Sequence, residues 1–222
     1  MHVEIIYNIS LFLTLTFILC NVDKCLCHRR WDGNYYLLHS LGNFIITYLC
    51  FDDLLISYND LFNFNKYKTD ITPSIITFSM HTYHIINYKD KLLFDDWVHH
   101  ILMCGVALPL SLYVKSGCLL NHGLFFLTGL PGAINYLNLF LVRNSYISRS
   151  IQKRINLYLN LWLRAPGCIS HFVLCILVMD SFDVFEKLFI RLTITLIFWN
   201  GIYFMNQVVQ NYAIERYLNN IS

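Results

Sequence analysis

The chain has 222 residues, of which 56% are hydrophobic and only 14% are charged, and its mean hydropathy is +0.48. This balance excludes an ordinary soluble domain and indicates a membrane protein. The net charge of +2 comes from short basic clusters between apolar segments, so no basic face exists to follow a phosphate backbone, and we expect no nucleic-acid partner.

Seven apolar segments are long enough to cross a bilayer, which takes about 20 residues of helix. The first segment is short enough to be a secretory signal, but it lacks a basic start and a small-residue cleavage site, so we expect it to be a span. The sequence predicts an all-α membrane protein with helices over residues 4–20, 36–57, 71–88, 92–114, 118–142, 155–179 and 184–206.

We divide the chain into a first helix with a basic loop (1–30), one membrane domain (31–212) and a polar tail (213–222). With seven spans, ten Lys and Arg residues fall on one side of the membrane and about five on the other. By the positive-inside rule, this bias predicts a lumenal N-terminus and a cytosolic C-terminus.

The cysteines suggest neither disulfides nor a complete zinc site. Cys25, Cys27 and His28 resemble half of a zinc site, but no second pair at ligand spacing follows in a soluble segment, which favours ordinary loop cysteines. A cysteine within an apolar segment usually behaves as a small hydrophobe, and this interpretation applies to Cys50, Cys104, Cys168 and Cys175.

Ionisable and amide groups occur inside the predicted spans, where a charge costs at least about 2.5–3.5 kcal/mol. Such groups normally face the interior of a bundle and serve a function. Counting residues from the cytosolic ends at about 1.5 Å each places groups from five helices in one layer. The lipid- or substrate-binding candidates are Asp52, near the lumenal end of the second span, and four members of this layer, which are His84, Asn135, Arg164 and Asn200.

The fourth predicted span carries the candidate catalytic residues His99, His100 and Asp96. Asp95 and His99, like Asp96 and His100, are four residues apart, so each carboxylate lies one turn from an imidazole. This spacing is typical of a base and the group that orients it. Alternatively, the two aspartates mark the start of the helix and one histidine bonds a neighbouring helix.

Two further features have both a functional and a structural interpretation. Arg164 is either the counter-ion of a ligand headgroup or the partner of an intramembrane aspartate. Pro131 with Gly132, and Pro166 with Gly167, are expected to kink their helices and free carbonyls toward a cavity.

The order of these motifs resembles the TLC-domain family, which includes ceramide synthases and proteins that sense, move or remodel lipids. The resemblance covers about residues 36–210. It rests on Leu38-His39-Ser40-Leu41, Asp52-Asp53, Asp96-Trp97-Val98-His99-His100, the segment PGAINYLNLFL (131–141), Asn160-Leu161-Trp162-Leu163-Arg164-Ala165-Pro166 and Asn200-Gly201-Ile202-Tyr203-Phe204.

The resemblance implies six core helices around a cavity, a histidine pair that faces it, and residence in the endoplasmic reticulum. In ceramide synthases such histidines serve N-acyl transfer from acyl-CoA to a sphingoid amine. Ceramide synthases also carry acidic residues on the helix after the pair, whereas residues 118–142 contain no Asp or Glu. This difference favours lipid binding or remodelling over the synthase reaction.

Three functions are therefore considered. The first is a protein that binds or remodels lipids in membrane lipid homeostasis; its partner is a membrane lipid or lipid precursor, it needs no cofactor, and a homo-oligomer is compatible with it. The second is an N-acyltransferase with acyl-CoA as co-substrate. The third, a metal-dependent lipid hydrolase or hydroxylase using His81, His84, His99 and His100, has fewer histidines than a di-iron site needs.

Overall fold

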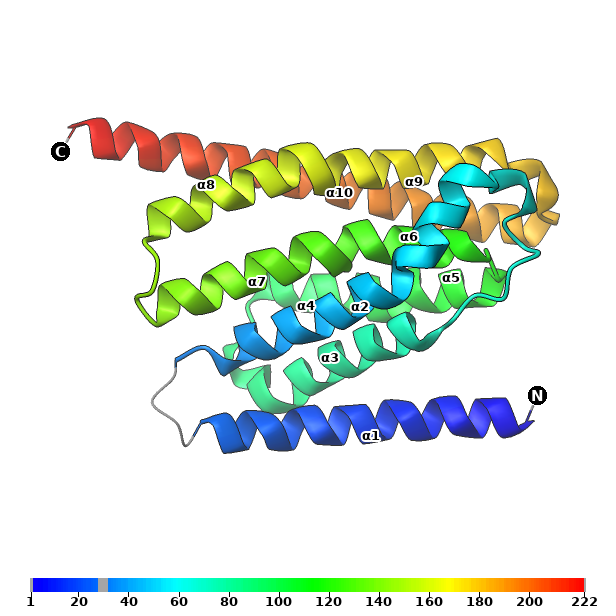
Figure 1. Cartoon of the computed structure of the whole chain (residues 1–222), viewed down its shortest axis with the longest axis horizontal. Helices are drawn as coiled ribbons and strands as arrows, with labels where there is room; N and C mark the ends of the chain where they lie inside the picture. Colours follow the sequence, from blue (N-terminus) through cyan, green and yellow to red (C-terminus); the bar gives the residue numbers. More distant parts are fainter. Residues whose placement is uncertain (1, 28–31, 222) are drawn as a thin grey trace.

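A computed structural model describes residues 2–27 and 32–221, with the side chains of residues 2, 3, 95 and 219–221 left out of the description. Every regular element in the described residues is helical, which confirms the predicted all-α class. Seven helical rods lie roughly side by side, and the two termini lie at opposite ends of the bundle (Figure 1).

The rods occupy the seven predicted segments. Three of them are interrupted by a π-helical stretch (η3, η4 and η5). In chain order they are α1 (His2–Leu26), α2 (Asn34–Asn59), α3 (Thr72–Tyr88), α4-η3-α5 (Phe94–His100, Ile101–Ala107, Leu108–Val114), α6-η4-α7 (Cys118–Leu124, Phe125–Gly129, Leu130–Arg143), α8-η5-α9 (Arg149–Leu159, Asn160–Arg164, Ala165–Leu177) and α10 (Val184–Ile221).

Six rods are long and apolar enough to cross a membrane, so the chain is a multi-pass helical membrane protein. The seventh, α3, has 17 residues, or about 26 Å of helix, and packs between α1 and α2. The segment predicted over 71–88 is thus a helix of the bundle, but it is shorter and more polar than the other six.

Each π-helical stretch ends two residues before a proline. η3 precedes Pro109, η4 precedes Pro131 and η5 precedes Pro166. Proline has no N–H to donate and its ring displaces the carbonyl four residues earlier, so the preceding turn widens. The kinks expected at Pro131 and Pro166 therefore take the form of wide turns inside continuous rods.

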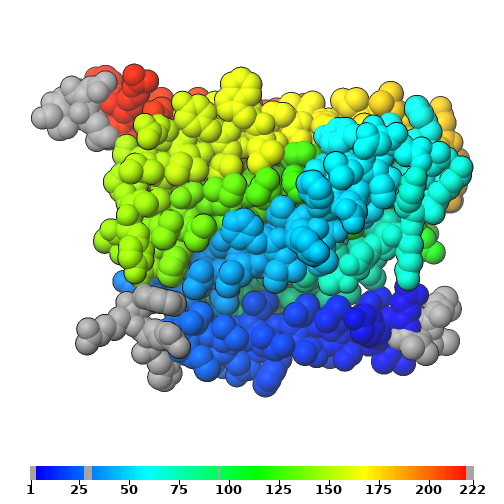
Figure 2. Space-filling view, viewed as in Figure 1, coloured from blue at the N-terminus to red at the C-terminus, as the bar shows by residue number. Residues whose placement is uncertain are grey.

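Helix α1 lies along one edge of the bundle, as the space-filling view shows (Figure 2). Many of its apolar side chains are exposed, as suits a helix that faces lipid. A buried carboxylate ties its end to α3, since Asp23 accepts hydrogen bonds from Asn87 Nδ2 at 3.0 Å and from Tyr88 Oη at 2.9 Å.

Helix α10 continues well past the predicted end at residue 206. It runs to Ile221, so the segment expected as a polar tail is helical up to that residue. An ion pair between Lys153 on α8 and Glu215 holds this extension against its neighbour. Hydropathy locates only the apolar part of such a helix, which explains the difference.

The two ends of the bundle are packed differently. At the end that carries the loops before α3, α6 and α10, apolar side chains form a dense cluster, which we call the packed end; it contains Phe64, Val114, Cys118, Leu119, Cys175, Val178, Ile190 and Ile194. The opposite half, toward the C-terminus of α10, contains the cavity described next.

Candidate functional site

A cavity of about 720 Å³ lies in the half of the bundle away from the packed end. Six rods supply its described wall, and α1 supplies none of it. The volume falls in the range of about 300–1,000 Å³ that is typical of small-molecule sites. Apolar side chains such as Met80, Leu102, Leu127 and Leu196 alternate with polar groups around it.

Seven of the eight candidate residues from the sequence line this cavity. They come from five rods, so the convergence expected from the depth count is found in the structure. These residues are Asp96, His99 and His100 on α4, His84 on α3, Asn135 on α7, Arg164 on η5 and Asn200 on α10.

Asp52 does not line the cavity. It is exposed on α2, about 20 Å along the helix from His39, which is on the cavity wall. The next residue, Asp53, points inward instead and accepts a hydrogen bond from Asn121 Nδ2 at 2.6 Å. Adjacent helical residues point about 100° apart, so only one of the two aspartates can face the interior.

Three cavity histidines are oriented in the same way. In each, ring atom Nδ1 lies within hydrogen-bond distance of the carbonyl four residues earlier. A carbonyl only accepts, so Nδ1 carries the proton and Nε2 of the neutral ring presents a lone pair. The pairs are His39 with Tyr35 (3.0 Å), His81 with Thr77 (2.8 Å) and His100 with Asp96 (2.5 Å).

The Asp96 carboxylate does not orient His100, contrary to the expected pairing. Its Oδ2 accepts the backbone N–H of Leu93 at 2.9 Å, and His100 bonds the backbone carbonyl of Asp96 instead. A carboxylate in the first helical turn caps free N–H groups there, which is the structural alternative considered for it. The same pairing was expected for Asp95 and His99, but the side chain of Asp95 lies outside the described residues.

The histidine rings form one cluster across α3 and α4. The Nε2 atoms of His81 and His99 are 3.4 Å apart, and the ring centroids of His84 and His100 are 5.1 Å apart. Since His81 carries its proton on Nδ1, the short contact requires His99 to donate from Nε2. Nε2 of His100 is buried and has no partner among the described residues, so it is free to accept from a ligand.

The described residues contain no group of three or more His, Cys, Asp or Glu side chains that could hold a metal ion. The third function therefore finds no preformed site among them. Of the half zinc site in the first loop, Cys25 and Cys27 are exposed and free, and His28 lies outside the described residues.

Polar wall residues follow a simple spacing, and all of those named here except Arg164 were missed in the selection from the sequence. Tyr35, His39 and Asn43 recur every four residues on α2, and so do Asn156, Asn160 and Arg164 on α8 and η5. Residues four apart share one face of a helix, so this spacing could have identified these wall residues from the sequence. Between the neighbouring helices α2 and α7, the hydroxyl oxygens of Tyr35 and Tyr136 are 3.4 Å apart.

Arg164 is the cation on the wall. Its Nη2 donates to Asn200 Oδ1 at 2.9 Å, and its guanidinium lies 4.6 Å from the centre of the Phe204 ring. Its Nε is buried without a partner among the described residues. An arginine at membrane depth costs at least about 2.5–3.5 kcal/mol, so its position calls for compensation by something in the cavity.

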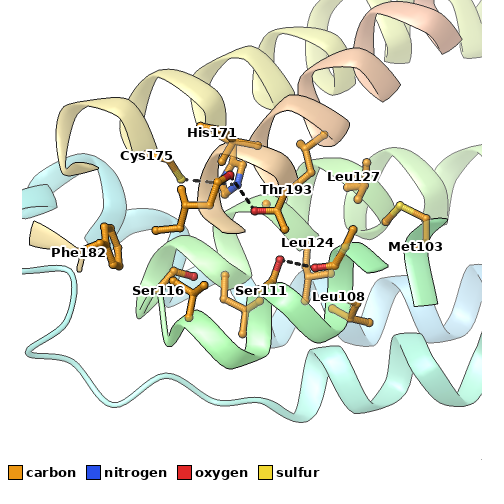
Figure 3. Close-up of a pocket in the computed structure, with 17 residues that line it drawn as sticks. Met103, Leu108, Ser111, Ser116, Leu124, Leu127, His171, Cys175, Phe182 and Thr193 are labelled. Carbon is orange, nitrogen blue, oxygen red and sulfur yellow. Dashed lines mark hydrogen bonds between the residues drawn. The ribbon is translucent and has the colours of Figure 1, made fainter. Parts of the chain in front are cut away.

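A second, much smaller pocket of about 40 Å³ lies toward the packed end (Figure 3). It has room for only a few water molecules. His171 and Cys175 point toward each other on its wall, with 3.7 Å between Nε2 and Sγ. The ring of His122, which stacks on His171, is completely buried and has no partner for either nitrogen among the described residues.

Comparison of the chain with protein-family models, with curated proteins and with solved structures finds no match.

Proposed function

We propose that the protein binds a lipid or another long-chain amphiphile in the cavity and takes part in membrane lipid homeostasis, as a protein of the TLC type. The cavity of about 720 Å³, in which polar groups of five rods meet an apolar wall, is the observation that carries this proposal. An amphiphile fits such a wall because its headgroup finds the histidines and Arg164, and its chain finds the leucines and methionines.

The resemblance in motif order supports the same function. His99, His100, Arg164 and Asn200, which belong to the motifs that carry it, all face the cavity, and the first helix stays outside the wall. On this proposal the protein resides in the endoplasmic reticulum with its C-terminus in the cytosol, and the cavity lies in the cytosolic half of the membrane.

The test is to fill the cavity. Leu196 lines it, whereas Leu192, one turn earlier on α10, is exposed on the outer surface. Leu196→Trp should lower the amount of lipid that co-purifies with the protein, measured by mass spectrometry, and Leu192→Trp should not. Wild-type protein that carries no lipid, or equal lipid content in both variants, would contradict the proposal.

N-acyl transfer is the second candidate function, and the free Nε2 of His100 favours it. A neutral imidazole with a lone pair can take the proton of an attacking amine. The amine nitrogen forms a bond to the acyl carbon, the carbon–sulfur bond of acyl-CoA breaks, and the departing thiolate takes up a proton. The missing acidic residues in 118–142 keep this function second.

Purified protein incubated with acyl-CoA and a panel of long-chain amines tests this reaction. N-acylated amine should form with wild-type protein and disappear in the double variant His99→Ala, His100→Ala. His171→Ala, at the small pocket, is the matched control and should retain the reaction. Wild-type protein that forms no product, or product that persists in the double variant, excludes the transferase.

A further inference from the structure

The charge on the cavity wall is not balanced. Arg164 has hydrogen-bonded contact with a neutral amide and ring contact with Phe204, but no described carboxylate lies within ion-pair distance of it. The ion pairs found among the described residues are Lys153 with Glu215 and Lys187 with Asp180. The guanidinium therefore faces the cavity as an uncompensated cation.

The carboxylate found on the described wall is already engaged. Asp96 belongs to the start of α4, where its Oδ2 accepts the N–H of Leu93. No bond joins it to Arg164, so the alternative of a structural ion pair with an intramembrane aspartate is not realised among the described side chains. Among the described side chains none supplies a negative charge to Arg164, and a bound anion would supply it.

The helix geometry aims Arg164 at such a molecule. The wide turn η5 (Asn160–Arg164) ends on this residue, and the fixed contacts with Asn200 and Phe204 hold the guanidinium in one orientation. Its Nε has no partner among the side chains that the structure describes, and an arginine fork binds carboxylate and phosphate oxygens in pairs. The site is thus arranged for two oxygens of one anionic group.

We propose that the ligand of the cavity is an anionic amphiphile, whose carboxylate or phosphate group pairs with Arg164 while its chain lies along the apolar wall. This inference rests on the proposed function and narrows it to a ligand class. A hydroxyl or amine donor in the headgroup of such a ligand would find its acceptor in Nε2 of His100, which also lines the cavity.

Ligands of equal chain length test the charge directly. Palmitate, hexadecyl phosphate, uncharged hexadecanol and inorganic phosphate are titrated into the wild-type protein, with binding measured by native mass spectrometry at neutral pH. Palmitate or hexadecyl phosphate should bind at least about 10-fold more tightly than hexadecanol, because charge-assisted hydrogen bonds stabilise only the anion. The stronger of the two identifies the preferred group.

Variants then locate the effect. Arg164→Gln should lower the affinity for the anionic ligand by about 10- to 100-fold without changing the affinity for hexadecanol. Arg164→Lys, which keeps the positive charge, should retain part of the affinity for the anionic ligand. Arg191→Gln, which removes an exposed arginine of α10 outside the cavity wall, is the matched control and should change nothing.

Equal affinity for hexadecanol and the anions in wild-type protein would overturn the inference while leaving the proposed function intact, and this result needs no variant to fold. Unchanged anion affinity in Arg164→Gln would also overturn it. If inorganic phosphate binds as tightly as hexadecyl phosphate, the apolar chain contributes nothing to binding, and the inference that the ligand is an amphiphile is contradicted. Wild-type protein that binds none of the long-chain ligands would overturn the inference and the proposed function together.

Discussion

Two groups of histidines in this bundle have opposite surroundings. At the cavity, the rings of His39, His81 and His100 are each held by a backbone carbonyl through Nδ1, and all three residues line the large cavity. Near the packed end, His122 is enclosed by side chains and neither of its nitrogens has a partner among the described residues. An imidazole in an apolar span is thus not by itself a sign of function.

The distinguishing feature is orientation combined with space. A ring that is fixed through one nitrogen and faces a large cavity with the other is prepared to meet a ligand. A ring enclosed by close packing contributes mostly its volume. The following substitutions test whether the two ends of the bundle differ in this way.

The largest effect is expected at the packed end, at Gly117. Its φ is +57°, and a Cβ atom there would collide with the carbonyl oxygen of Phe64. Gly117→Ala should therefore lower the free energy of unfolding by about 3 kcal/mol or more, seen as a large fall in Tm or in the yield of folded protein.

Gly105, in η3 of the cavity half, is the matched control because a Cβ atom built on it meets no atom within 4 Å. Gly105→Ala should leave Tm unchanged or raise it slightly, since alanine loses less backbone entropy on folding. Similar losses of stability in both variants would show that the two ends are packed alike.

Smaller effects are expected when leucine replaces histidine, on stability near the packed end and on lipid binding at the cavity. His122→Leu removes two buried nitrogens without described partners, so the free energy of unfolding should stay the same or rise by about 1 kcal/mol. His100→Leu should instead lower the amount of co-purified lipid, because it removes an acceptor from the cavity wall.

Thermal unfolding and lipid analysis of both variants give the answer. If His122→Leu costs more than about 2 kcal/mol, the ring nitrogens of His122 have a bonding role and the comparison fails. If His122→Leu loses co-purified lipid and His100→Leu keeps it, the enclosed histidine and not the cavity histidine takes part in lipid binding, which contradicts the comparison.

The smallest effect concerns the loop beside the packed end. Asp60 accepts hydrogen bonds from Tyr67 Oη at 2.6 Å and from Asn63 Nδ2 at 2.8 Å, and these bonds lower the pKa of Asp60 below its ordinary value of 3.8. A lowered pKa in the folded state stabilises the fold above the ordinary pKa, and this contribution is lost as the pH falls through the lowered value.

Tyr67→Phe should accordingly lower Tm slightly at neutral pH, and the difference from wild type should vanish as the pH falls through the lowered pKa of Asp60. Tyr146→Phe, at another exposed loop tyrosine, is the control and should show no pH-dependent difference. A difference in Tm for Tyr67→Phe that stays constant with pH would mean that the loop is stabilised by the tyrosine ring and not by the bond to Asp60.

The positions of the seven rods were predictable because hydropathy and helix length fix them, and the shared cavity layer was predictable because a helix rises by a constant distance per residue. The faces of single residues were not. Asp52 and Asp53 look alike in the sequence, yet only Asp53 points inward, where Asn121 binds it.

The chemistry within α4 shows a second limit. The spacing of Asp96 and His100 permits a bond between carboxylate and imidazole, but the unpaired N–H groups at the start of the helix compete for the same carboxylate. The imidazole of His100 then bonds the backbone carbonyl of Asp96. Spacing shows which groups are within reach of each other, whereas the outcome depends on every other donor and acceptor nearby.

The three wide turns before Pro109, Pro131 and Pro166 set the rotation of whole half-helices. Each holds one residue more per turn than an α-helix, and removal of one residue would rotate everything on one side by about 100° against the other. In the rod that contains η5, Asn156, Asn160 and Arg164 line the cavity, and Cys175, beyond the wide turn, belongs to the packed end. One rod thus lines a binding site with half of its length and closes the bundle with the other half.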